Sequence, residues 1–265
     1  MKKILQVINT IAFVITIVVN YVAGAGLLNG QTIGDISARY ENLFTPAGYA
    51  FSIWGVIYLM LAGFVIYQAR GLFKKVEKDD FILQIGWWFV ISSIANSLWL
   101  IAWVHDYIGL SVILITVLLF SLIKIVINTN MERWDAPFPK IVLLWWPFCF
   151  YSGWITVAVI ANISAYLTKV GWQGWSISDP TWAINMIIIA GLINLFMIIT
   201  RNMREFALVG IWGLVAVAVA NWSIHQPIVV TAIIVSVILF AAIAIHGYQN
   251  RATAPHIKLK QMINN

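Results

Sequence analysis

The chain has 265 residues, of which 62% are hydrophobic and only 10% are charged, against roughly 25% charged residues in ordinary soluble domains. A water-soluble fold cannot bury this much apolar surface, so the composition excludes a soluble protein and indicates an integral protein of the lipid bilayer. The formal net charge of +6 comes from basic loops, described below, and does not indicate a nucleic-acid partner.

Eight apolar runs follow one another along the chain, and each is long enough to cross a membrane. A helix of about 20 residues spans a hydrocarbon core of roughly 30 Å. Lipid offers the backbone no hydrogen-bond partners, so each run should be an α-helix. The sequence therefore predicts an all-α integral membrane protein with about eight transmembrane helices. The predicted spans are residues 4–28, 47–68, 82–104, 107–127, 141–166, 182–200, 206–222 and 227–248.

The first predicted span partly resembles a secretory signal. It follows the basic start MKK and ends near the small residues Ala23-Gly24-Ala25, as a cleavable signal does. The run is long for a signal peptide, and Asn9 and Asn20 interrupt it. We therefore expect a retained helix.

The basic residues indicate the orientation of these spans. With the N-terminus in the cytoplasm, fourteen of the 16 Lys and Arg residues lie on the inner side, and only Arg39 and Lys169 lie outside. Cytoplasmic loops carry an excess of Lys and Arg, so we expect both termini in the cytoplasm. The short loops and the MKK start are typical of a bacterial inner (plasma) membrane.

The second predicted span opens with FTPAGYAFSIWGVIY, residues 44–58. Pro46 suits the first turn of a helix because it lacks an N–H group, and Gly48 permits tight packing or an unusual turn. Trp54 and Tyr58 are four residues apart and so share one helical face. Both lie deeper than an interfacial belt requires, and a buried indole N–H needs an acceptor.

Similar aromatic faces recur in the third and fifth predicted spans. The run NSLWLIAW places Asn96 and Trp99 on one face of the third span. In the fifth span, Pro147 should kink the helix and open room beside Tyr151 and Trp154. Three spans thus offer aromatic faces with polar tips, a lining that suits a flat, apolar ligand with a few polar atoms.

The connecting segments give three further expectations. The outer loops 29–46 and 167–181 are long enough to hold a short cap over a cavity. The mixed-charge inner segment 69–81 should be solvated, and the polar tail after Tyr248 should be frayed.

The last three predicted spans are rich in small residues, which allow helices to approach closely. We expect these residues to serve packing; they are Gly191, Gly210, Gly213, Ala216 and Ala220. Amide side chains within spans need hydrogen-bond partners, so each should face another helix, and the alternative is a bond to a ligand. These amides are Asn96, Asn162, Asn185, Asn194 and Asn221.

Chemistry that depends on buried charge has no visible machinery in this sequence. All ten acidic residues lie in loops or at span ends, whereas ion-coupled carriers usually hold one inside the membrane. The chain shows no nucleotide-binding loop and no H-E-x-x-H motif. The lone Cys149 and four scattered histidines predict no metal site.

The opening motif of the second span resembles the P-x-G…W-x-x-x-Y signature of the TspO/MBR family, the tryptophan-rich sensory proteins related to the mitochondrial translocator protein. Asn96, Pro147, Tyr151 and Trp154 continue the resemblance, which covers about residues 1–167. It implies a TspO-like five-helix bundle over 1–167. A three-helix C-terminal extension over 168–250 and a cytoplasmic tail over 251–265 would then have no counterpart in the family.

The resemblance implies a membrane binder or sensor of flat apolar ligands, such as tetrapyrroles (porphyrin, haem) or sterol-like molecules. No cofactor is predicted apart from porphyrin or haem as a ligand. The expected partners are the lipid bilayer and a small apolar ligand, and a homodimer stays open. The predicted ligand-binding residues are Trp54, Tyr58, Asn96, Trp99, Tyr151 and Trp154, and Pro46, Gly48 and Pro147 should shape the pocket.

Two other functions stay open at this level. A transporter or channel for a small neutral or amphipathic solute would use the helices as a path, although the chain shows no inverted repeats. An enzyme acting on lipid or tetrapyrrole is the third reading, because some proteins of the resembled family are proposed to degrade porphyrin photochemically with the help of Trp.

Overall fold

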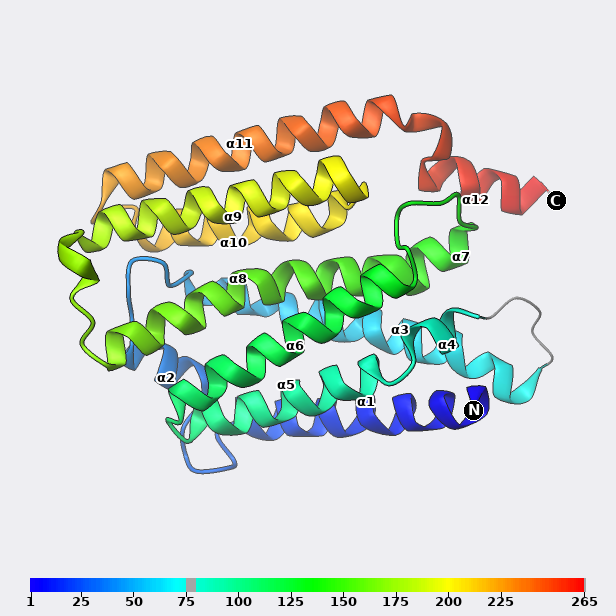
Figure 1. The fold of residues 1–265 in the computed structure, drawn as a ribbon, viewed down its shortest axis with the longest axis horizontal. Helices are drawn as coiled ribbons and strands as arrows, with labels where there is room; N and C mark the ends of the chain where they lie inside the picture. Colours follow the sequence, from blue (N-terminus) through cyan, green and yellow to red (C-terminus); the bar gives the residue numbers. More distant parts are fainter. Residues whose placement is uncertain (75–79, 265) are drawn as a thin grey trace.

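The computed structural model describes residues 1–74 and 80–264, and the regular secondary structure of this part is entirely helical (Figure 1). Residues 75–79 of the predicted mixed-charge turn lie outside the described residues. The first part comprises α1 (Lys2–Gly24), α2 (Ile33–Arg39), η1 (Gly48–Ser52), α3 (Ile53–Phe73), α4 (Phe81–Ile85), α5 (Trp88–Val104) and α6 (Ile108–Asn128). The second comprises α7 (Phe138–Lys140), η2 (Ile141–Trp145), α8 (Trp146–Lys169), η3 (Gly174–Ser176), α9 (Asp179–Arg201), α10 (Arg204–Ala220), α11 (Gln226–Gln249), η4 (Arg251–Thr253) and α12 (Pro255–Asn264).

Each of the eight predicted spans coincides with a long helix, but the count of eight is not confirmed. Within the described residues, six helical segments are long and apolar enough to cross a membrane. The other two, α5 and α10, have 17 residues each. In the predicted span 82–104 the helix is interrupted at Gly86, whose φ of 54° lies in the left-handed region that glycine tolerates.

The helices run roughly along the long axis of the molecule, and both chain termini lie at one end of it (Figure 1). We call this the termini end, and the opposite end, which carries α2 and the loop to η1, the pocket end. Helices α1, α5, α6, α8 and α3 pack in a ring, in which each helix contacts the next and α3 contacts α1. Helix α10 packs on α8 and η1, and α9 and α11 complete a layer with it.

Glycines create the close contacts of this layer. A Cβ atom on Gly153 of α8 would lie 2.8 Å from the carbonyl oxygen of Phe206 in α10. On Gly210 it would lie 2.3 Å from the Asn194 side chain of α9, and on Gly191 2.5 Å from Val235 of α11. The predicted packing role of the small residues is therefore confirmed at Gly191 and Gly210, because only a missing side chain permits these distances.

Pro147 produces a π-helical turn where a kink was predicted. The turn covers Ile141–Trp145, directly before α8. Proline has no N–H to donate and its ring crowds the preceding turn, and a widened turn is one way in which a helix accommodates this. Tyr151 and Trp154, which the kink was expected to give room, are tightly buried at 2% and 1% exposure.

The C-terminal tail was predicted to be frayed, but the structure shows that it is folded. Residues 255–264 form α12, which packs against α7. The Lys258 ammonium lies 2.6 Å from an Asp135 carboxylate oxygen. A polar segment that could not fold alone thus finds its partners on a loop far away in sequence.

Candidate ligand-binding site

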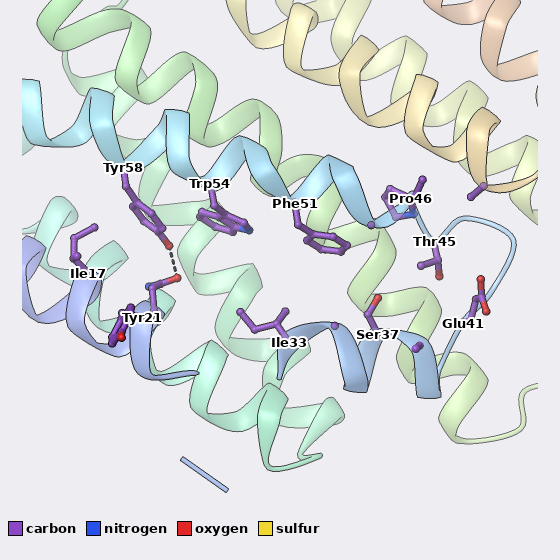
Figure 2. Close-up of a pocket in the computed structure, with 16 residues that line it drawn as sticks. Ile17, Tyr21, Ile33, Ser37, Glu41, Thr45, Pro46, Phe51, Trp54 and Tyr58 are labelled. Carbon is purple, nitrogen blue, oxygen red and sulfur yellow. Dashed lines mark hydrogen bonds between the residues drawn. The ribbon is translucent and has the colours of Figure 1, made fainter. Parts of the chain in front are cut away.

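A cavity of about 770 Å³ opens at the pocket end between α1, α2 and the start of α3 (Figure 2). The predicted cap in loop 29–46 is present as α2, which forms one wall. The cavity is lined by Ile17, Asn20, Tyr21, Ile33, Gly34, Ser37, Ala38, Glu41, Thr45, Pro46, Ala47, Gly48, Phe51, Trp54, Tyr58 and Ala220. Glu41 is the one charged residue in this lining, so the cavity is mostly apolar with a few polar groups.

The turn that begins the second predicted span is held by α10. The Ala47 N–H donates to the Ala216 carbonyl at 3.0 Å, and the Trp212 indole donates to the Ala50 carbonyl at 3.0 Å. The Asn221 amide of the same region donates to the Leu43 carbonyl at 3.0 Å. Helix α10 and the turn after it therefore support the rim of the cavity, although the small residues of α10 suggested only packing.

Gly48 does not have the conformational role expected of it. Its φ is not positive, and an added Cβ atom would meet nothing within 4 Å. Pro46 and Gly48 line the cavity, whereas Pro147 lines neither this cavity nor the smaller one described below. The bend at the cavity mouth comes from the short helix η1 and its bonds to α10.

Trp54 and Tyr58 share one face of α3, as predicted, and both line the cavity. Their rings are stacked, with centroids 5.3 Å apart and an interplanar angle of 20°. The Tyr58 hydroxyl donates to the Asn20 amide oxygen, the dashed bond in Figure 2. Asn20 in turn donates to the Asn96 amide oxygen at 2.8 Å. Asn96 is fully buried behind this contact and lines neither cavity.

A second, smaller cavity of about 50 Å³ lies on the other side of Phe51 and Trp54. Trp99 and Trp154 line it. The Trp99 indole donates to the Asn162 amide oxygen at 2.8 Å. Trp154 is 1% exposed, and its Nε1 has no hydrogen-bond partner among the described residues. A buried donor without a partner is uncommon.

The predicted aromatic residues converge on Trp54. Its ring centroid lies 6.0 Å from Trp99, 6.0 Å from Tyr151 and 6.4 Å from Trp154. Edge-to-face and tilted pairs at such distances are favourable arrangements of aromatic rings. Tyr151 supports this cluster from behind, since it lines neither cavity.

Helix α2 is fixed over the cavities by α5 and the turn after it. The Trp103 indole donates to the Ile33 carbonyl at 3.1 Å, and the Tyr40 hydroxyl donates to Asp106 at 3.1 Å. Asp106 also lies 2.9 Å from Lys169 and 3.7 Å from Arg39. Burial would raise the pKa of Asp106, but its bonds to Lys169 and Tyr40 and the charge of Arg39 outweigh that and lower it. The only two basic residues expected outside thus meet at one carboxylate.

Several lining residues were missed by sequence reasoning, notably Asn20, Phe51 and those of α2. A local signal for α2 existed in TIGD, where Thr32 and Asp35 form a capping box, a known mark of a helix start. Asn20 was noted only as an interruption of the first span. Its role depends on α1 and α3 meeting, which no local pattern shows.

Comparison with known proteins gave one match. A family model described as TSPO-like protein matches residues 6–245. The match includes α9, α10 and most of α11, and so extends beyond the residues 1–167 from which the resemblance was drawn. No curated protein and no solved structure matches the chain.

Proposed function

Because this chain belongs to the TSPO-like family and is an integral membrane protein, we propose that it binds and senses a flat, largely apolar ligand. The ligand would occupy the cavity of about 770 Å³ at the pocket end. The observation that carries the proposal is the stacked pair of Trp54 and Tyr58, which forms an aromatic wall along this cavity.

The size and lining of the cavity suit such a ligand. Pockets for small molecules measure roughly 300–1,000 Å³ and are mostly apolar with a few placed polar groups. Here the polar groups are the Tyr58–Asn20 pair at one end and the hydroxyls of Ser37 and Thr45 at the other. A flat ring system can stack on Trp54 while its polar atoms reach these groups.

The proposed ligands are tetrapyrroles, such as porphyrin or haem, and sterol-like molecules. Among the residues that the structure describes, Glu41 is the only charged one that lines the cavity, so none of them offers a basic side chain to pair with a ligand carboxylate. A porphyrin would therefore have to direct its carboxylates toward water. A neutral sterol-like molecule needs no such arrangement.

The alternative of a transporter or channel has less support. At the termini end α1 and α3 are joined by polar bonds: Gln6 donates to the Gln68 carbonyl at 2.6 Å, and Asn9 donates to the Gln68 amide oxygen at 3.0 Å. The two cavities that share Trp54 are both at the opposite end. Cavities at one end, together with hydrogen bonds that join α1 and α3 at the other, favour a ligand-binding protein over a transporter.

Four further features belong to the proposal. The excess of Lys and Arg favours termini in the cytoplasm of a bacterial inner membrane. The five-helix region 1–167 and the extension 168–250 would act as one unit, because α10 holds the cavity rim. The proposal also includes a cytoplasmic tail over 251–265 and assembly as a homodimer.

The test is a titration of the purified full-length protein in nanodiscs with protoporphyrin and with a fluorescent sterol, followed by Trp fluorescence. Saturable quenching is expected for at least one of them. Trp54→Ala should weaken binding by about 30-fold or more, because it removes an aromatic surface worth roughly 2 kcal/mol. Trp175→Ala is the matched control, since Trp175 is 78% exposed and lines neither cavity.

The absence of saturable quenching with both probes would refute the proposal. So would equal affinities of the Trp54→Ala variant and the wild type. Ligand flux across sealed liposomes that depends on Trp54 would favour the transporter instead.

A further inference from the structure

A second polar site lies at the termini end, away from both aromatic cavities. It is a small hollow of about 30 Å³ between the α6–α7 connection, the α9–α10 turn and the start of α12. Its lining includes Glu132, Asn202, Arg204, Glu205 and Pro255. The sequence placed both glutamates in loops or at span ends.

Glu132 is buried in this hollow to an unusual degree for a carboxylate. It is 8% exposed, and its Oε1 has no hydrogen-bond partner among the described residues. The Glu205 Oε2 is also buried and makes no hydrogen bond of normal geometry within the described residues, and the Trp146 indole lies near Glu205. Isolated carboxylates are rarely buried in the ionised form, because burial disfavours the charge.

The backbone holds Glu132 in place at some cost. Its φ is 58°, and the nearby Asn130 has a φ of 46°, a left-handed conformation that non-glycine residues seldom adopt. The Asn202 amide donates to the Glu132 carbonyl at 3.3 Å, which ties this loop to the α9–α10 turn. Strain of this kind persists only where the surrounding structure enforces it.

The charges in the lining leave one carboxylate without a counterion. Asp135, the third acidic residue of the lining, is paired with Lys258 of α12 at 2.6 Å. The remaining cation of the lining is Arg204, which faces two carboxylates, those of Glu132 and Glu205. If both were ionised, the hollow would carry a net negative charge with little access to water.

Other titratable and charged groups lie around the hollow without lining it. Cys149 of α8 lies within electrostatic reach of both glutamates, and His246 of α11 within reach of Arg204. Arg201 lies within reach of Arg133, which carries the same charge. The Lys140 ammonium lies 5.3 Å from the ring centroid of Trp134, which lines the hollow.

We propose that Glu132 and Glu205 bind one proton between them at neutral pH, and that this proton holds the junction of α6, α10 and α12 closed. The protonated carboxyl group donates to the other carboxylate, whose remaining charge is balanced by Arg204. Loss of the proton leaves two like charges in one small hollow, which should loosen the contacts around Pro255. The proposal does not depend on the ligand of the larger cavity.

The pKa of Glu132 supports this assignment. Burial raises it most, and the negative charge of Glu205 raises it further. Together they raise the pKa of Glu132 from 4.5 to about 8, although Arg204 acts in the opposite direction. Carboxyl groups that share a site titrate as a pair, with one of the two pKa values strongly raised.

The test is infrared spectroscopy of the full-length protein in nanodiscs as the pH is raised from about 5 to about 10. The carbonyl stretch of one buried protonated carboxyl group should be present at pH 7 and disappear as the pH passes about 8. Glu132→Gln should abolish the band at pH 7, because Glu205 alone beside Arg204 ionises. Glu205→Gln should shift its disappearance to lower pH, and Glu41→Gln, an exposed control at the pocket end, should leave it unchanged.

A second measurement covers the case in which a variant does not fold. Protection of residues 255–264 against hydrogen exchange, taken relative to the intrinsic exchange rate at each pH, should fall at least several-fold in the wild type above pH 8, and Glu132→Gln should remove that fall. A wild type without a protonated carboxyl band at pH 7 would overturn the proposal. A band that persists unchanged in both Gln variants would overturn it too, as would carboxylate bands that shift only when Na⁺ or Ca²⁺ is added to cation-depleted protein.

Discussion

The two ends of this helical bundle use polar groups in opposite ways. At the pocket end, a wide cavity is lined by aromatic rings and by neutral amides and hydroxyls, with Glu41 exposed at its edge. At the termini end, a hollow of about 30 Å³ contains Glu132, Glu205 and Arg204. We infer from this contrast that neutral polar groups suit a site that must admit an apolar ligand. Buried charges instead suit a small site that must stay closed.

The largest expected effect on stability concerns the contact between α8 and α10, two helices that run between these two ends (Figure 1). Gly153→Leu would force a side chain into the 2.8 Å gap between its Cβ position and the Phe206 carbonyl. Overpacking costs about 1–3 kcal/mol and occasionally more, so we expect about 3 kcal/mol of destabilisation. A thermal melt in detergent would measure it.

Gly48→Ala is the control for that change, because nothing lies within 4 Å of its Cβ position. A Gly153→Leu protein that melts at the same temperature as Gly48→Ala would show that this contact is not tightly packed.

The next effect concerns pH and separates the charged end from the neutral one. The folded-state pKa of Glu132 is raised to about 8 from an ordinary value of 4.5, mainly by burial. The folded protein thus binds the proton more tightly than the unfolded chain, and this stabilisation is complete below pH 4.5 and lost as the pH rises through about 8. We expect a loss on the order of 2 kcal/mol between pH 5 and pH 9, visible in melting temperatures.

Glu132→Gln should flatten that pH dependence because it removes the titrating group. Affinity for the apolar ligand should change little over the same range, since the large cavity lies at the other end. A melting temperature that rises toward pH 9 would contradict the raised pKa.

A smaller effect is expected at the inner aromatic cavity. Trp154→Phe keeps an aromatic ring but removes the Nε1 donor, which has no partner within the described residues. If a ligand acceptor uses this donor, the substitution should weaken binding by roughly 5- to 10-fold. This corresponds to the loss of one hydrogen bond, which contributes about 1 kcal/mol. Trp99→Phe is the comparison, because the Trp99 donor already bonds to Asn162. Equal affinities of Trp154→Phe and the wild type would exclude Trp154 from the binding site.

The smallest effect is expected at the surface cluster that fixes α2. Asp106→Asn removes the charge that pairs with Lys169 and Arg39. Exposed ion pairs contribute about 0.2–1 kcal/mol, so stability should change by about 0.5 kcal/mol. Ligand dissociation, measured by stopped-flow fluorescence, should become about two- to three-fold faster because α2 covers the cavity. An unchanged rate would show that α2 does not limit ligand release.

Much of the fold could be predicted from the sequence, because lipid makes the constraint local. Each apolar run must satisfy its own backbone, so runs of hydrophobic residues mark helices to within a few residues at most ends. The prediction was less good at Gly86 and at the tail, where a left-handed glycine and a distant ion pair decide the structure. The site was found in part. Trp54 and Tyr58 share a helical face by spacing alone, whereas the contribution of Asn20 required α1 and α3 to be placed together.

By itself, the sequence determined that this is an all-helical membrane protein, where its long helices lie, and which aromatic residues share a face, because hydrophobicity and helical period are properties of neighbouring residues. The tertiary structure alone decided that α2 and α10 complete the rim of the cavity and that the Trp154 donor has no partner within the described residues. It alone decided that Glu132 is buried beside Glu205 and Arg204. These features depend on residues far apart in the chain, and burial and charge pairing arise only when those residues are brought together.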